Sequence, residues 1–508
     1  LLSECDREQF QKKEISLSPG AKEKIYIQKF YLYLNLTKPT KFLFLSWAKV
    51  SGEGKSLRPS YLIQELMRLF PNLKPVDEEE KSWQQCEMTR RTGILRLAEG
   101  LREKEQGLDA QWKELYTWFA GDEKSRSVVE KLLRAGFYKK EAGMLGSQMA
   151  EKLYLDPERV SVTRLEKFAS CAYAHFLSYG LRLSDRETYG FEAMDLGNIA
   201  HQALERFARK AEEEKLDWVT MPEERRTELI DESVESSVLD YGNTVLFSSA
   251  RNEYMIYRIK RLIRRSVWAL TRQMEQGDFK PAGYEFKFGS GKIDRIDTCE
   301  DENRVYVKVT DYKTGMKTFD ITAFYHGLQL QLMIYMDGAL TVEQNKHKDK
   351  DVIPAGVFYY NIKDPMIQEK IDADIETVQE KVLKELKMNG LVLKDKELVQ
   401  KMDSSLVSIP VSFNKDGSFR KNSSVASKEQ FDILNRYVKT KISHIRQSIM
   451  TGDAQVSPYM IGKKNACTYC PYSGVCGFDM DIPGYEFRRL KNFTDEELWD
   501  AFVKEVDE

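Results

Sequence analysis

The stretch VTDYKTG, residues 309–315, closes an alternating apolar run, RVYVKVT. Successive side chains of a β-strand leave opposite faces, so Asp311 and Lys313 share one face of the predicted strand. A second run, GKIDRID, lies at residues 291–297, and the turn-rich segment CEDENR separates the two. The pattern predicts an antiparallel hairpin that brings Asp294 close to Asp311.

Two carboxylates and a lysine at adjacent strand ends have two interpretations. On an exposed hairpin they form an ion pair, which contributes at most about 1 kcal/mol. In a hydrolytic site the carboxylates supply hard oxygen ligands to Mg²⁺, which activates water and neutralises charge on a phosphate. Lys313 would then orient that water or help to deprotonate it, and stabilise the transition state. The tripeptide D-x-K alone is too common to decide between them.

Two predicted helices add candidate residues. His201 lies in LGNIAHQALERFARKAEE, residues 196–213, beside the apolar stripe of that helix. Gln331 and Tyr335 are four residues apart in QLMIY, so they lie one above the other on a helix face. Taken singly, His201 is typical of a partly buried structural histidine, and the other two of an ordinary amphipathic surface.

The order of the four motifs GNIAH, GKIDRID, VTDYKTG and QLMIY resembles the RecB-type branch of the PD-(D/E)XK nuclease superfamily. The resemblance implies an α/β fold in which a mixed-sheet nuclease core is flanked by helices. It also implies a divalent metal, Mg²⁺, at the site. The residues implied as metal ligands are His201, Asp294, Asp311 and the backbone carbonyl of Tyr312, and those implied as catalytic are Asp294, Asp311, Lys313, Gln331 and Tyr335.

Three of the seven cysteines crowd into ACTYCPYSGVCGF, as Cys467-x2-Cys470-x5-Cys476. Three thiolates at this spacing are a strong metal signal. No histidine follows nearby, and Cys171, almost three hundred residues upstream, is a candidate fourth ligand. From the residues alone, either zinc or an iron–sulfur cluster fits.

One cysteine before the nuclease motifs and three after them resembles the iron-staple nucleases, including AddB-type helicase–nuclease subunits. That resemblance implies a [4Fe–4S] cluster, with Zn²⁺ as the alternative, that joins the two ends of the nuclease domain. Closing so long a loop is where a covalent clip helps most in principle. The implied ligands are Cys171, Cys467, Cys470 and Cys476.

The composition is that of a globular protein with a balanced charge. The chain has 508 residues, of which 42% are hydrophobic and 31% charged, with a net charge of −2. We find neither a run of ~18 apolar residues nor a secretory signal, so no membrane span is predicted. The odd number of irregularly spaced cysteines favours a reducing compartment. The resemblance to AddB-type subunits implies the bacterial cytoplasm.

With this net charge, DNA contacts must come from a local basic surface. YRIKRLIRR places Arg258, Arg261 and Arg265 on one side of a predicted helix. They are candidates for tracking a phosphate backbone. A solvated helix face is the alternative, because charge runs usually are solvated.

The N-terminal part predicts a helicase remnant without an ATP site. KVSGEGKSLRPS imitates a P-loop, but Lys49 stands where the motif requires glycine. LNLTKPTKFLFLSWA resembles the last motif of UvrD-like helicases, with Lys38 in place of the expected arginine. We expect a degenerate helicase remnant at 1–59, a helical connecting region at 60–159, the nuclease domain at 160–490 and a C-terminal helix at 491–508.

The remaining secondary-structure expectations follow from periodicity and turn residues. Expected helices cover residues 161–181, 223–275, 323–340 and 430–452. Expected strands cover residues 41–50, 283–289, 291–298, 304–313, 352–362 and 405–413.

Taken together, the resemblance implies the C-terminal part of an AddB-type subunit without the ATPase region. The implied activity is a Mg²⁺-dependent DNA exonuclease in an ATP-dependent helicase/deoxyribonuclease complex that repairs double-strand breaks by homologous recombination and cuts the 5′-ended strand. The implied partners are linear duplex ends, single strands and an AddA-type subunit as heterodimer.

Two alternatives remain. A non-catalytic DNA-binding scaffold is disfavoured by the full His/Asp/Asp/Lys set. A stand-alone iron–sulfur nuclease is disfavoured by the helicase-like stretch at residues 18–48, since such nucleases are much shorter.

Overall fold

The computed structural model describes residues 3–15, 17–52, 54–77, 89–102, 108–139, 143–154, 160–184, 186, 190–241, 244–288, 291–368 and 374–507. The chain divides into two compact units, Leu1–Leu97 and Ala98–Glu508. No helix among these residues is long and apolar enough to cross a membrane.

The first unit contains the helices α1 (Glu4–Lys12), α2 (Ala21–Thr37) and α3 (Tyr61–Leu69) and the start of α4 (Arg90–Arg102). No described residue of α2 or α3 is buried. The expected strand at 41–50 is wrong: none of residues 41–49 forms one, and Phe42 and Phe44 are 78% and 89% exposed. An apolar run becomes a strand only when a neighbouring strand takes up its backbone hydrogen bonds.

A six-stranded mixed sheet forms the centre of the second unit, in the order β1-β2-β3-β4-β5-β6. The pairs β3–β4 and β5–β6 are parallel, and the other pairs are antiparallel. This confirms the expected mixed-sheet α/β core. The strands are β1 (Lys280–Phe288), β2 (Gly291–Glu300), β3 (Arg304–Lys313), β4 (Asp351–Asn361), β5 (Asn389–Leu393) and β6 (Val425–Ala426).

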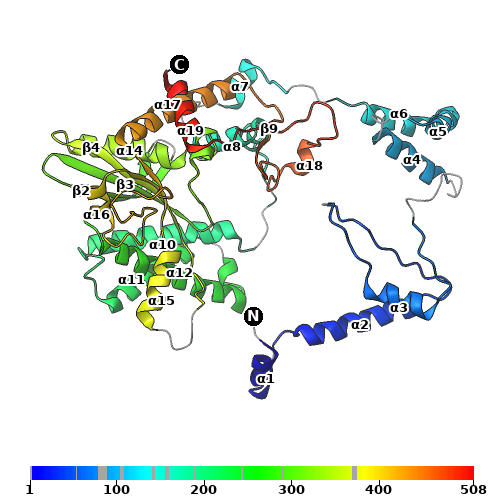
Figure 1. Ribbon diagram of the computed structural model, residues 1–508, viewed down its shortest axis with the longest axis horizontal. Helices are drawn as coiled ribbons and strands as arrows, with labels where there is room; N and C mark the ends of the chain where they lie inside the picture. Colours follow the sequence, from blue (N-terminus) through cyan, green and yellow to red (C-terminus); the bar gives the residue numbers. More distant parts are fainter. Residues whose placement is uncertain are drawn as a thin grey trace. The chain divides into compact units, whose positions relative to one another are not determined.

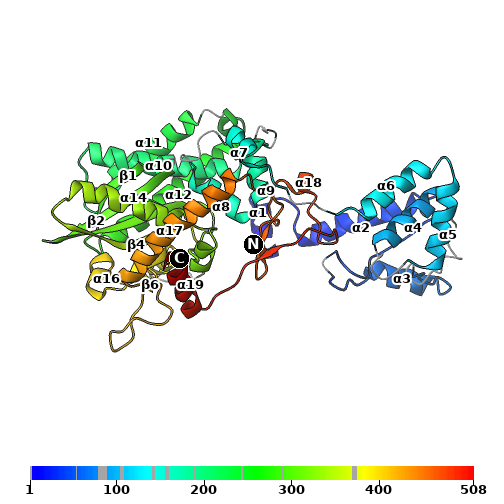
Figure 2. The ribbon, with the colours of Figure 1, turned by 90° about the horizontal axis from the view of Figure 1, so that it is seen from above.

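Helices cover both faces of this sheet, with α14 and α17 on one face and α10, α11 and α12 on the other (Figure 1). Figure 2 shows α17, in orange, beside α14 and α8. Because both faces are covered, β3 and β4 are buried almost throughout. The helices are α8 (Val162–Ser170), α10 (Ala193–Glu213), α11 (Glu223–Asp240), α12 (Ala250–Met274), α14 (Gln331–Lys346) and α17 (Lys428–Met450).

The remaining elements precede or follow this core in the sequence. After α4 come α5 (Ala110–Gly121), α6 (Arg126–Gly136) and α7 (Ser147–Leu153), and α15 (Ile375–Glu385) and α16 (Lys396–Met402) follow β4 and β5. A second sheet has the order β8-β7-β9. It consists of β7 (Tyr459–Ile461), β8 (Lys464–Asn465) and β9 (Arg488–Arg489), and the chain forms α18 (Ser473–Cys476) between β8 and β9 and α19 (Asp495–Asp507) after them.

Three expected helices are each interrupted. The one at 223–275 is α11 and α12, because Ser249 caps α12 by accepting from the Asn252 amide at 3.3 Å. The one at 323–340 is α13 (Ile321–Tyr325) and α14, with Gly327 at a φ of +78° between them. A left-handed glycine is a usual helix terminator.

The third interruption lies at a cysteine. The helix expected at 161–181 ends as α8 at Ser170, and Cys171 has an extended backbone with a φ of −163°. The chain then continues as α9 (Ala172–His175) and a π-helix, Phe176–Gly180. The side chain of Cys171 therefore sits at a joint between helices.

The strand expected at 405–413 is also wrong. The carboxylate of Asp403 accepts hydrogen bonds from the backbone amides of Ser405, Leu406 and Ser408, at 2.9, 3.0 and 2.7 Å. Amides held by a side chain are not available to a strand ladder. The place in the sheet beside β4 is taken instead by β5.

A buried cluster of charges joins β2 to β3 on the face toward α12. Asp297 pairs in register with Lys308. Its carboxylate lies 2.6 Å from Arg295 and 2.8 Å from Lys308. Although burial acts to raise it, the pKa of Asp297 is lowered by these two cations. Arg295 is 2% exposed and also lies over the ring of Trp218.

We expect Asp297→Asn to destabilise the protein by about 3–5 kcal/mol, because it leaves two buried cations without an anion. Thermal melting measures the change. The matched control is Asp351→Asn, which breaks an exposed ion pair with Lys428 and should change stability by less than about 1 kcal/mol. Equal melting temperatures for the two variants would contradict the expectation.

Candidate active site and cysteine centre

Three carboxylates form a row across β1, β2 and β3. The register of β2 against β3 pairs Arg295 with Thr310, which sets Asp294 opposite Asp311. The register of β1 against β2 likewise sets Glu285 opposite Asp294. All three acids are buried, and Asp311 is 1% exposed. The expected hairpin is therefore present, and it extends to a third strand.

Glu285 is a site residue that sequence reasoning missed. Its backbone φ is +49°, a conformation that is uncommon for a non-glycine residue and that recurs at functional sites. His201, Glu285 and Asp294 offer ligand atoms within 4.8 Å of one another, and no other group of three in the described part of the chain does. The available signal was one acid inside the apolar strand GYEFKF.

Lys313, Gln331 and Tyr335 converge on Asp311. The ammonium of Lys313 is ion-paired with Oδ2 of Asp311. The side-chain amide of Gln331 donates to Oδ1 of Asp311 and to the hydroxyl of Tyr335, both at 3.0 Å. The sheet and α14 thus bring the residues predicted as catalytic into one contact network.

His201 reaches the same place from α10. Its Nδ1 lies 3.4 Å from Oδ2 of Asp294. The same oxygen accepts from the backbone amide of Tyr312 at 2.7 Å. The ring of Tyr312 lies edge-on to His201, with centroids 6.2 Å apart. The role of the Tyr312 carbonyl as a ligand stays a prediction.

The buried carboxylates give the site an electrostatic environment that favours a bound cation. Burial and the charge of Asp294 raise the pKa of Asp311 to about 7, against the opposing effect of Lys313 and His201. Burial and Asp294 also raise the pKa of Glu285 to about 7. Carboxylate oxygens with one imidazole form a donor set suited to a divalent cation. The residues present therefore fit the Mg²⁺ that the fold family implies.

The four predicted cysteine ligands also lie together. Burial raises the pKa of the Cys467 thiol to about 11, and the charges of Cys171, Cys470 and Cys476 act in the same direction. A contact between side chains holds the two chain segments side by side, since the hydroxyl of Tyr472 lies 2.9 Å from that of Ser178. Cys171 is buried, and Cys467, Cys470 and Cys476 are partly buried. They fit a metal centre that spans the two ends of the nuclease core.

The three remaining cysteines lie apart from this group in the sequence. Cys5 belongs to α1, Cys299 is buried in β2, and Cys86 is outside the described residues.

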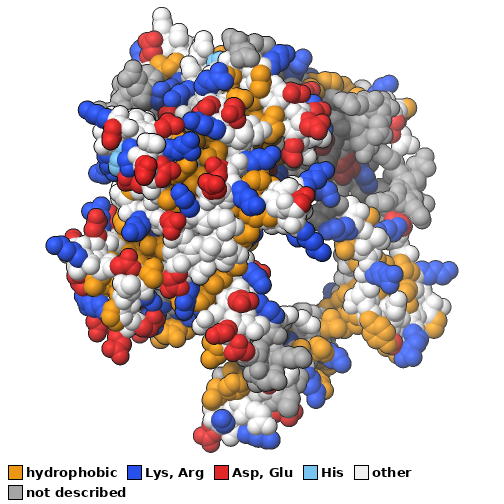
Figure 3. Space-filling model, turned by 60° about the vertical axis from the view of Figure 1, so that its left-hand side comes forward, with side chains coloured by type: hydrophobic (Ala, Val, Ile, Leu, Met, Phe, Trp, Pro, Cys, Tyr) orange, Lys and Arg blue, Asp and Glu red, His pale blue; other side chains and the backbone are white. Residues whose placement is uncertain are grey.

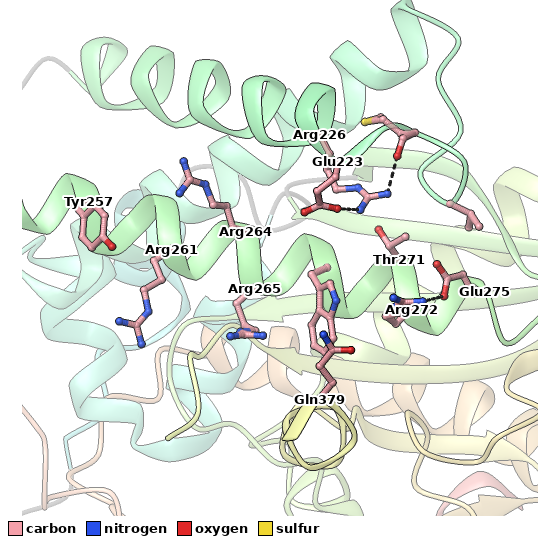
Figure 4. Close-up of a pocket in the computed structure, with 13 residues that line it drawn as sticks. Glu223, Arg226, Tyr257, Arg261, Arg264, Arg265, Thr271, Arg272, Glu275 and Gln379 are labelled. Atoms are coloured by element: carbon pink, nitrogen blue, oxygen red, sulfur yellow. Dashed lines mark hydrogen bonds and ion pairs between the residues drawn. The ribbon is translucent and has the colours of Figure 1, made fainter. Parts of the chain in front are cut away.

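The predicted arginines lie along α12, and two of them, Arg261 and Arg265, line a cavity of about 690 Å³. Arg261 and Arg265 point to the same side of the helix (Figure 4) and both pair with Asp364. Arg258 is exposed and forms no ion pair with the described residues. Five arginines and two aromatic residues are among those that line the cavity: Arg226, Arg261, Arg264, Arg265, Arg272, Tyr257 and Trp268.

The surface drawn in Figure 3 carries basic and acidic side chains interspersed, in keeping with the net charge of −2. The five arginines that line the cavity along α12 are therefore a local concentration of positive charge. Arg265 also lies over the ring of Trp268, at 5.2 Å from its centroid.

Comparison with known proteins finds relatives along the whole chain. The B subunit of an ATP-dependent helicase/deoxyribonuclease from Lachnoclostridium phytofermentans is 38% identical over 99% of this chain and 46% of its own length. Proteins of the same name from Thermoanaerobacter sp. and Clostridium acetobutylicum are 32% and 31% identical over 100% of this chain and 47% of their own lengths. The chain spans about half the length of these curated relatives.

The sequence profile of the PD-(D/E)XK nuclease superfamily matches residues 159–477. This segment contains the sheet, the carboxylate row and all four cysteines of the centre. The match covers more than half of the chain. The chain therefore belongs to the PD-(D/E)XK nuclease superfamily.

Proposed function

We propose that this chain carries a Mg²⁺-dependent deoxyribonuclease that hydrolyses phosphodiester bonds. The observation that carries the proposal is the convergence of His201, Asp294, Asp311 and Lys313 at the ends of β2 and β3. The names of the relatives supply the substrate class, DNA. The full set of residues favours a working enzyme over a DNA-binding scaffold.

In this proposal each residue has a role that its contacts support. His201, Asp294 and Asp311 would hold the Mg²⁺. Glu285 would be a further ligand, since its carboxylate lies with His201 and Asp294 in one group of ligand atoms within 4.8 Å of one another. Bound Mg²⁺ would supply an activated water and would neutralise charge on the phosphate.

The remaining residues act on the water and on the carboxylates. Lys313 holds an ammonium beside Asp311, where it orients the water and stabilises developing negative charge. Gln331 fixes Asp311 through the bond to Oδ1, and Tyr335 fixes Gln331. Burial of the carboxylates keeps bulk water from competing for the cation.

We further propose that Cys171, Cys467, Cys470 and Cys476 hold a [4Fe–4S] cluster. Cys171, Cys470 and Cys476 lie close enough to Cys467 for their charges to act on its thiol. Their order along the chain, one cysteine before the nuclease motifs and three after them, supports a cluster over a zinc ion through the resemblance to iron-staple nucleases.

The cavity along α12 supports a track for the DNA backbone. Arg261 and Arg265 would contact phosphates, as would Arg258, which is exposed one turn earlier on the same helix. Tyr257 and Trp268 offer rings on which bases stack, as aromatic residues do in single-strand channels. Asp364, which holds two of the arginines, follows β4 closely, and β4 ends beside Lys313. The track would therefore begin near the site.

By the likeness to helicase/deoxyribonuclease B subunits, we propose exonuclease action within an ATP-dependent complex that repairs double-strand breaks by homologous recombination. An AddA-type subunit would be the partner in a heterodimer. The 5′-ended strand would be the one cut, and the bacterial cytoplasm would be the location. The helicase-like stretch at 18–48 favours this assignment over a stand-alone iron–sulfur nuclease.

We expect Asp294→Ala and Lys313→Ala each to lower Mg²⁺-dependent cleavage of linear DNA by at least about 10²-fold, without a change in fold. Glu285→Gln should lower it by about 10- to 100-fold. The control is Glu300→Gln, on the same hairpin and outside the site, which should cleave normally. Full cleavage by Asp294→Ala would overturn the proposed function.

We expect charge reversal of Arg258 and Arg261 together to weaken DNA binding and to flatten its dependence on salt. Binding is measured at several salt concentrations. Reversal of Lys346 and Lys439, exposed on the other side of the sheet, makes the same change in net charge. If both double variants keep the salt slope of the unmodified protein, the helix α12 is merely solvated.

We expect Cys470→Ser to lose the brown absorbance of a [4Fe–4S] cluster, to melt at a lower temperature and to become sensitive to proteolysis between residues 455 and 490. A site that forms only in the folded protein contributes its binding energy to stability. Cys299→Ala, at a buried thiol outside the centre, should keep its iron.

Two results would count against the cluster. A colourless protein purified without oxygen and holding one zinc ion per chain would identify a zinc centre. A Cys470→Ser protein with unchanged iron content and melting would show that these cysteines are not ligands.

A further inference from the structure

A carboxylate outside the proposed chemistry lies at the start of α14. Oε1 of Glu166, on α8, accepts hydrogen bonds from the backbone amides of Leu330 and Gln331, at 2.8 and 3.1 Å. The first amides of a helix have no acceptor within their own helix, and a carboxylate there is favoured by the helix dipole. Glu166 therefore caps a helix from a distant part of the chain.

A single residue, Gln331, connects the cap to the proposed metal ligand Asp311. The residue whose amide is held, Gln331, is also the residue whose side chain bonds Oδ1 of Asp311. Because the hydrogen bond holds the backbone of Gln331, it also restricts where the side chain of Gln331 can lie. The chain of contacts runs from Glu166 through Gln331 to Asp311.

The position of Glu166 is set in turn by α8. This helix ends at Ser170, and Cys171 follows directly. α8 packs against both α14 and α17. A single short helix thus leads into the cysteine centre and also carries the carboxylate that caps the helix beside the active site.

We infer that Glu166 is a positioning residue for the nuclease reaction, which aligns the carboxylate of Asp311 by capping α14 at Gln331. The inference rests on the proposed function. It does not place Glu166 in contact with the metal or the DNA.

Two substitutions separate positioning from direct chemistry. Both amides bond to the same oxygen, Oε1, so the side-chain oxygen of glutamine can accept both. Glu166→Gln should therefore cleave DNA at close to the normal rate. Glu166→Ala should lower kcat by about 10- to 100-fold and leave KM unchanged, as for residues that support a ligand. If Glu166→Gln fails as badly as Glu166→Ala, the carboxylate acts directly and the inference is overturned.

A double-mutant cycle tests the route through Gln331. Once Gln331→Ala has removed the bond to Asp311, adding Glu166→Ala should lower the rate no further. Additive losses would overturn the route. The matched control is Asp395→Ala, whose carboxylate caps α16 in the same way, through the amides of Glu397 and Leu398 at 2.9 and 3.1 Å. It should cleave normally.

Hydrogen exchange gives a readout independent of activity. In Glu166→Ala the amides of Leu330 and Gln331 should exchange faster, and in Glu166→Gln they should not. Unchanged exchange in Glu166→Ala would overturn the capping role. If exchange rises while the rate of cleavage stays normal, the cap is structural only and positioning is overturned.

Different results would overturn the proposed function and the positioning role of Glu166. Full activity of Asp294→Ala removes the proposed function, whatever Glu166 does. Full activity of Glu166→Ala in a protein that Asp294→Ala inactivates removes only the positioning role.

Discussion

The register between β2 and β3 is the constraint on which the rest of the site depends. A shift by one residue would move every side chain of one strand to the other face of the sheet. In the observed register Asp294 faces Asp311 on the side of α14, and Asp297 faces Lys308 on the side of α12. The buried ion pair on one face therefore fixes the geometry of the acids on the other, because both depend on the same ladder of hydrogen bonds.

The two faces of this hairpin differ in how their charge is balanced. Asp297 has two cations, Arg295 and Lys308, and its pKa is lowered. Asp311 is buried beside one ammonium and a second carboxylate, and burial together with that carboxylate raises its pKa. The first arrangement is complete without a ligand. In the second arrangement a divalent cation would offset the repulsion between the two carboxylates. The same strands therefore carry a neutralised ion cluster on one face and an excess of negative charge on the other.

Much of the site was predictable, because its residues lie in strands and helices with clear periodicity. The period of two placed Asp311 with Lys313, and the turn before Arg304 predicted the hairpin. What failed were features that depend on contacts distant in sequence or on single capping atoms. Glu285 joins the site only through the register of β1, and the strand expected at 405–413 is prevented by the carboxylate of Asp403. Gly327, which follows α13, could be identified as the end of that helix only once its positive φ was known.

Helix α8 would connect the proposed cysteine centre to the proposed active site. The carboxylate row needs α14 held in one position, and the amides at the start of α14 find their acceptor on α8. A helix of nine residues is too short to be stable by itself in water. Packing against α17 and a ligand at Cys171 would both hold it. A centre that closes the domain would thereby act on the geometry of the active site through one helix, without contact with the reacting atoms.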